Sequence, residues 1–161
     1  MDLTVANEIA IGIRTSGTTP IDPYGSEEDI NRLLKVVTED SFVLPSHRRV
    51  LLCTREVVSI PLDAYGRIEL RSTWARMGLL APPTSADPGF HGNLTMEVFN
   101  ASERPIIIRA GDVMWSLILS PIYPGTTVPP YNGRYQGQEG LTLPKPLIRK
   151  VVQDNPLFYR G

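Results

Sequence analysis

The chain has 161 residues, which suits one domain with a substantial core and leaves little room for a second. Its 16 Lys and Arg residues nearly balance 17 Asp and Glu residues, giving a formal net charge of −1. This balance argues against a basic field over the whole surface, so we expect neither nucleic acid nor an anionic membrane as a partner. No apolar run approaches the roughly 20 residues of a membrane helix, and no leader pattern opens the chain, so we expect a soluble cytoplasmic protein.

In chain order, the first predicted elements are a strand over LTVANEIAI (3–11) and a short helix within SEEDINRLLKVV (26–37). Ser26 is a suitable N-cap for this helix, acidic residues follow in the first turn, and the apolar residues of the window share one helical face. This is the only window with a clear helical period.

The remaining segments alternate or run apolar over lengths typical of strands, and turn residues bound each of them. Fifteen prolines and thirteen glycines separate these segments along the whole chain. The pattern predicts a mainly β protein, a sandwich or barrel of short strands with little helix. The predicted strands are SFVLP (41–45), RVLLCTREVVSIP (49–61), RIELRST (67–73), NLTMEVFN (93–100), RPIIIRAGDVMWSLILSPI (104–122) and GLTLPK (140–145).

The sequence lacks the residue patterns that several common types of enzyme require. His47, His91 and Cys53 have no metal-ligand spacing, and no HxE pairs with CxxC as in zinc-dependent nucleobase deaminases, so we expect no protein zinc site. The GxSxG, GxxxxGK[ST] and GxGxxG patterns are also absent, which argues against a serine hydrolase, a P-loop enzyme or a dinucleotide enzyme. Cys53 lies in an apolar run and is read as a small core residue, and the lone thiol excludes a disulfide within the chain.

The strand NLTMEVFN directs one carboxylate away from its apolar face. Side chains alternate along a strand, so Leu94, Met96 and Val98 share one face and Glu97 lies on the other. Taken alone, Glu97 is equally well explained as a solvated strand residue. Its importance therefore depends on the polar segments that accompany it.

Two further segments concentrate polar groups. RSTWARMG (71–78) places Arg71, Ser72 and Arg76 within six residues, a cluster of donors suited to a polyphosphate. PPYNGRYQGQEG (129–140) is a glycine-rich loop with two tyrosines, an arginine and two glutamines, which could close over a bound base and sugar. Each segment alone is explained at least as well by surface charges or by an ordinary hairpin connection.

In this order, the three segments resemble the dCTP deaminase branch of the trimeric dUTPase superfamily. RSTWARMG is similar to the branch's RSSxxRxG motif, ADPGFHGNLTMEVFN (86–100) to its IDPGFxGxLTLEL segment, and YNGRYQGQEGLT (131–142) to its YQGQxG lid. The resemblance spans roughly residues 40–145. It implies a distorted jelly-roll β-barrel with one or two short helices, a homotrimer, and active sites between subunits. It also implies one dUTPase-like domain over residues 1–161, with residues 126–161 as the C-terminal lid and tail.

The resemblance also implies the roles of individual residues. Glu97 becomes the general base and acid of a deamination of dCTP to dUTP, shielded from solvent in the active site. Magnesium would arrive bound to the substrate triphosphate, without a dedicated protein ligand and without zinc. The implied substrate contacts are Arg71, Ser72 and Arg76 at the triphosphate and reacting site, Asp87 at the deoxyribose, and Tyr131, Arg134 and Gln138 in the lid.

Three other functions stay open beside simple deamination. A bifunctional enzyme would carry dCTP through to dUMP, and a dUTP diphosphatase would use Asp87 to orient the attacking water. Glu97 favours deamination, because the dUTPase branch ordinarily has no acidic residue at that position, and the chain lacks the GGFGS segment of the dUTPase lid. The non-enzymatic alternative is a nucleotide-binding regulatory trimer on the same scaffold.

Overall fold

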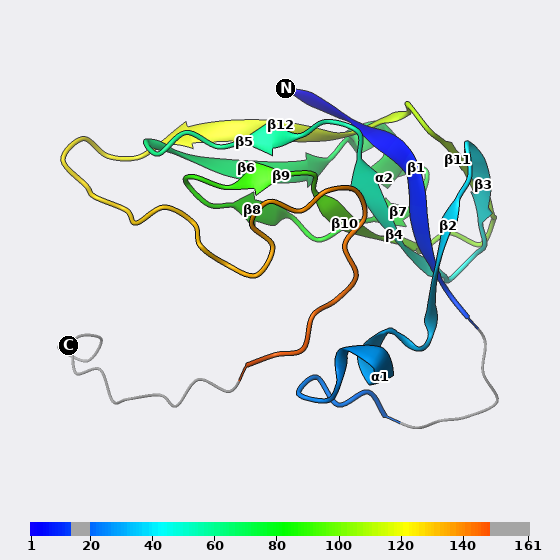
Figure 1. The fold of residues 1–161 in the computed structure, drawn as a ribbon. Helices are drawn as coiled ribbons and strands as arrows, with labels where there is room; N and C mark the ends of the chain where they lie inside the picture. The colour runs from blue at the N-terminus through cyan, green and yellow to red at the C-terminus, as the bar shows by residue number, and fades with distance from the viewer. Residues whose placement is uncertain (14–19, 149–161) are drawn as a thin grey trace, which may run out of the picture.

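The computed structural model describes residues 1–13 and 20–148. Figure 1 shows a mainly β fold. The described residues also form two short helices. Neither helix is long and apolar enough to cross a membrane. The elements are β1 (Asp2–Gly12), α1 (Glu27–Asn31), β2 (Leu34–Thr38), β3 (Ser41–Leu44), β4 (Arg49–Thr54), β5 (Val58–Ser59), β6 (Ala64–Leu70), α2 (Ser72–Arg76), β7 (Leu79–Leu80), β8 (Thr84–Ala86), β9 (His91–Gly92), β10 (Thr95–Asn100), β11 (Ile106–Arg109) and β12 (Val113–Pro121).

One curled sheet organises the molecule. Its strands follow the order β7-β10-β4-β1-β12-β6-β8, with β2 also paired to β1, and all of these pairs are antiparallel. Two smaller antiparallel pairs, β3 with β11 and β5 with β9, complete the described strands. The mainly β architecture expected from the sequence is therefore confirmed.

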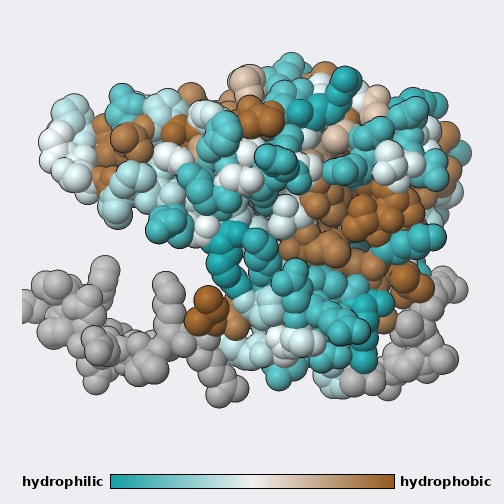
Figure 2. Space-filling view, viewed as in Figure 1, coloured by the Kyte–Doolittle hydropathy of each residue, from teal (hydrophilic) through white to brown (hydrophobic). Residues whose placement is uncertain are grey.

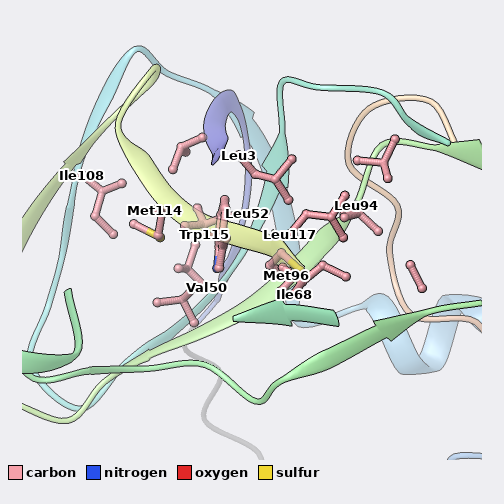
Figure 3. Close-up of a cluster of buried hydrophobic side chains, with 14 of the residues drawn as sticks. Leu3, Val50, Leu52, Ile68, Leu94, Met96, Ile108, Met114, Trp115 and Leu117 are labelled. Carbon is pink, nitrogen blue, oxygen red and sulfur yellow. The ribbon is translucent and has the colours of Figure 1, made fainter. Parts of the chain in front are cut away.

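The core lies on the concave side of this sheet. Figure 3 shows side chains from β1, β4, β10 and β12 meeting there, among them Leu3, Leu52, Met96 and Trp115, each at most 1% exposed. The alternation predicted for β10 is confirmed, since Met96 and Val98 are buried whereas Glu97 and Phe99 are exposed. Burial of this apolar face fixes the register of β10 and so turns Glu97 outward.

The helix predicted within residues 26–37 is only half correct. Ser26 does cap α1, because its Oγ accepts from the N–H of Asp29 at 3.1 Å, but the helix ends at Asn31. The second half of the window forms β2, which pairs with β1 from Leu34 to Thr38. The β-branched pair in this half favours a strand, and the edge of β1 offers backbone partners that a lone helix end lacks.

The strand predicted for GLTLPK (140–145) is wrong. The segment has no ladder partner, and side chains accept its backbone N–H groups instead. The Leu141 N–H donates to Glu8 Oε2 at 2.8 Å, and the Thr142 N–H donates to Thr95 Oγ1 at 3.0 Å. Its alternating sequence therefore reflects contact with the sheet through side chains rather than membership of it.

Candidate active site

A cavity of about 330 Å³ opens on the outer face of the sheet. Strands β4 and β10 form its floor, and the end of β8 forms one side. The opposite side comes from the C-terminal segment, which contributes Tyr131, Tyr135, Gln138, Thr142 and Pro144. The cavity therefore joins segments that are far apart in the sequence.

Glu97 lies on the floor of this cavity. It pairs directly with Leu51 of β4, and Thr95 flanks it on the same face of β10. The Glu97 side chain is exposed in the single subunit, so the shielding expected of an active-site glutamate is not provided by this chain alone. A catalytic role would require a further surface above the carboxylate.

Arg49 also lines the cavity, and sequence reasoning missed it. It begins β4 and pairs with Phe99, two residue pairs along from the Glu97–Leu51 pair and therefore on the same face. No local motif marks this arginine. Its place depends on the pairing of β4 with β10, which a single sequence does not display.

Asp87 and Tyr131 meet on one side of the cavity. Asp87 follows β8 and begins a turn in which the Phe90 N–H donates to the Asp87 carbonyl at 3.0 Å. The Tyr131 N–H donates to the Pro88 carbonyl at 2.7 Å, and the Tyr131 ring packs edge-on against Phe90 at 5.7 Å between centroids. The predicted sugar contact and one predicted lid contact are thus neighbours in the fold.

Gln138 joins the C-terminal segment to the loop before β10. It forms a parallel bridge with Gly92, and its carbonyl accepts from the Asn93 N–H at 2.9 Å. The Gln138 amide donates in turn to the Asn93 carbonyl. The Asn93 side chain accepts from the Gly140 N–H at 3.0 Å and donates to the Thr54 carbonyl at 3.0 Å. Residues 136–142 are therefore docked on their own subunit.

Four predicted substrate contacts lie outside the lining of this cavity. Arg71 precedes α2 and forms an ion pair with Asp2 at 2.5 Å, while Ser72 and Arg76 lie at the two ends of that helix. All three side chains are exposed. Arg134 donates instead to the Pro146 carbonyl, with its guanidinium 6.0 Å from the centre of the Tyr135 ring. The tail expected within residues 126–161 lies, from residue 149 onward, outside the described residues.

A family model described as dCTP deaminase-like matches residues 1–122, which is most of the chain. The chain belongs to the dCTP deaminase-like family. Within this family it is 40% identical over 147 residues to a dCTP deaminase of Pyrobaculum arsenaticum, covering 91% of this chain and 80% of that protein. It is 38% identical over 149 residues to a dCTP deaminase of Sulfurisphaera tokodaii, covering 90% of this chain and 75% of that protein. The family expected from the three motifs is thereby confirmed.

A solved structure supports the fold of this dCTP deaminase-like protein. The 2′-deoxycytidine 5′-triphosphate deaminase from Agrobacterium tumefaciens superposes with a TM-score of 0.56 at 19% identity, covering 74% of this chain and 36% of that one. The described residues contain no group of three or more His, Cys, Asp or Glu side chains that could hold a metal ion. Among residues 1–13 and 20–148, two carboxylates line the cavity, those of Asp87 and Glu97.

Proposed function

We propose that the protein deaminates dCTP to dUTP and ammonia, with Glu97 as the general base and acid. The observation that carries this proposal is the position of Glu97 on the floor of a cavity that also holds Asp87, Tyr131 and Gln138. Membership of the dCTP deaminase-like family and the similarity to named dCTP deaminases support the same activity.

A single carboxylate is sufficient for the proton transfers of this hydrolysis. Glu97 takes a proton from water as the oxygen attacks C4 of cytosine, and it passes this proton to the ring nitrogen. It then takes the remaining proton from the new hydroxyl on C4 and gives it to the departing amino group. The C4–N bond then breaks, so that dCTP and water give dUTP and ammonia. General acid–base catalysis of this kind typically contributes about 10²- to 10⁴-fold. Asp87 would bind the deoxyribose, and Tyr131 and Gln138 would hold the sugar and phosphates from the C-terminal segment.

We propose a homotrimer, because one subunit leaves the site incomplete. Glu97 is exposed, whereas Arg71, Ser72 and Arg76 lie in or just before α2 and do not line the cavity. A neighbouring subunit that placed its α2 over the cavity would shield the carboxylate and supply cations for the triphosphate. Arg134 would join them after release from the Pro146 carbonyl.

Exposed apolar surface also supports self-association. Figure 2 shows apolar residues gathered between α1 and the body of the sheet. A groove of about 660 Å³ lies in this region, and Ile11, Val43 and Phe99 line it with exposed fractions of 37%, 58% and 38%. Contiguous apolar surface of this kind usually marks an interface.

Magnesium would enter as part of the substrate, bound by phosphate oxygens and water, where it offsets negative charge. The two lining carboxylates are too few for a dedicated protein cage. We propose a zinc-independent reaction for the related reason that the described residues offer no cluster of nitrogen and sulfur ligands. We place the enzyme in the cytoplasm, where its single thiol would stay reduced.

A second candidate is a bifunctional enzyme that releases dUMP. The observation that favours it is the presence of Asp87 in the same cavity as Glu97, because a second carboxylate could orient water for attack on a phosphate. A dUTP diphosphatase without deaminase activity leaves Glu97 without a role, and so does a regulatory nucleotide-binding trimer.

Incubation of the purified protein with dCTP and magnesium, followed by separation of the products, distinguishes these functions. Ammonia with accumulating dUTP is the expected result. Ammonia with dUMP and pyrophosphate would establish the bifunctional route, and hydrolysis of added dUTP alone would establish a diphosphatase. Binding of dCTP without turnover would contradict every enzymatic alternative.

A further inference from the structure

Glu8 lies at an irregular point of β1. The register of β1 against β4 shifts between Val5 and Ile9, two residues that are each 1% exposed in the core. Glu8, between them, is half-buried. The described residues form three ion pairs, His47–Glu103, Arg67–Glu69 and Arg71–Asp2, and none of them includes Glu8. A half-buried carboxylate that is in none of these ion pairs needs hydrogen-bond donors to compensate for its lost hydration.

The Glu8 carboxylate contacts the backbone of the C-terminal segment. Its Oε2 accepts from the Leu141 N–H at 2.8 Å. Gly140, the residue before, has a φ of +63°, and a Cβ at that position would collide with the carboxylate. Residues 140 and 141 therefore lie directly against Glu8, and the glycine permits both the backbone conformation and the close approach.

This contact lies at the middle of the wall of the cavity. The cavity is lined on either side of Leu141, by Gln138 before it and by Thr142 and Pro144 after it. Residues 140–145 of this segment are not paired with any strand. Its backbone N–H groups depend on three side chains of the sheet and its loops, namely Asn93 for Gly140, Glu8 for Leu141 and Thr95 for Thr142. Of these acceptors, only Glu8 carries a charge, which makes its bond the strongest of the three.

We propose that Glu8 is a positioning residue that fixes residues 140–142 against the sheet, so that this wall of the cavity is formed before the nucleotide binds. Loss of the acceptor would leave the Leu141 N–H unpaired and would let Leu141 and Thr142 move away from the sheet. The consequence for catalysis rests on the proposed function, whereas the contact itself does not. Preorganisation of this wall would lower the ordering cost of nucleotide binding.

Hydrogen exchange of the protein without nucleotide tests the proposal directly. In Glu8→Ala, we expect the Leu141 amide to exchange at least about tenfold faster, since a hydrogen bond to a charged group is lost. Amides of β10 should keep their protection. Glu8→Gln keeps a carbonyl oxygen as acceptor and should restore most of the protection. Glu39→Ala, in the exposed turn after β2, is the matched control and should change nothing.

Kinetics with dCTP supplies the second readout. We expect the KM of Glu8→Ala to rise by about tenfold with a smaller change in kcat, and Glu8→Gln to stay near the wild type. Unchanged exchange at Leu141 in a folded Glu8→Ala variant would overturn the proposal. If Glu8→Ala does not fold, Gly140→Ala displaces the same contact from the other side, and protection of Leu141 in that variant would equally contradict it. Faster exchange in a protein that does not turn over dCTP would support the positioning role and refute the proposed function.

Discussion

Cys53 is fully buried in β4, opposite Thr95 of β10. Burial, and secondarily the negative charge of Glu8, raises the pKa of the Cys53 thiol to about 12. The thiolate is the reactive form, so we expect the folded protein to resist alkylation at pH 8 and the unfolded protein to react completely. Labelling of native Cys53 at the rate of an exposed thiol would contradict this placement.

The same thiol links stability to pH. Because its pKa is higher in the folded state than the ordinary 9.0, its contribution to stability is fully present below about pH 9 and is lost as the pH rises toward 12. Denaturant unfolding at pH 8 and pH 10.5 measures this loss. We expect the wild type to lose more stability over this interval than Cys53→Ala, and an equal loss in both proteins would argue against the raised pKa.

The orientation of a single side chain can be predicted from the sequence where one structural rule determines it. Strand alternation correctly turned Glu97 away from the core, because Met96 and Val98 require burial on the other face. The roles of Glu97 and of the other site residues stay predictions. The position of Arg49 in the cavity was not predicted, because it depends on the pairing of β4 with β10, which are far apart in the sequence.

At the scale of elements, Gly92 tests the docking of the C-terminal segment. It has a φ of +143°. A Cβ at this position would lie 2.7 Å from the backbone carbonyl oxygen of Gln138 and 2.9 Å from the backbone nitrogen of the same residue. We expect Gly92→Ala to push Gln138 out of place and to weaken dCTP binding by about tenfold or more, measured by titration calorimetry.

Gly125→Ala is the control for that experiment. Gly125 also has a positive φ, +87°, but a Cβ there would meet nothing within 4 Å. This variant carries the backbone strain without the collision, so its affinity for dCTP should stay close to that of the wild type. Equal losses in both variants would show that strain, rather than contact with Gln138, governs binding.

A strand could be predicted where the local sequence pattern agrees with the strand pairing in the structure. Most strands appear near their expected positions, because apolar alternation and turn residues mark them locally. The helix predicted within residues 26–37 and the strand predicted for GLTLPK were wrong for opposite reasons. The first gained a partner strand in β1, and the second found side-chain acceptors in place of a strand partner. Both outcomes depend on distant residues, which local patterns do not reveal.

At the scale of the whole molecule, the proposed trimer divides one active site between two subunits. Arg76→Ala and Glu97→Gln should each lose most of their activity alone. In each trimer that contains both variants, about one third of the sites would combine an intact Glu97 with a neighbour's intact Arg76. Co-expression with two affinity tags and assay of the doubly purified protein measures this recovery. Absence of any recovery would place both residues in one chain's site.

The central claim is that Glu97 performs the proton transfers of deamination, and Glu97→Gln tests it most directly because the substitution keeps the shape and removes the base. The measurement is ammonia release from dCTP, together with dCTP affinity by titration, with Glu39→Gln as a matched change outside the cavity. We predict that ammonia release falls by about 10²- to 10⁴-fold in Glu97→Gln. The affinity for dCTP should be retained, and Glu39→Gln should keep full activity. Full deamination by Glu97→Gln would contradict the claim.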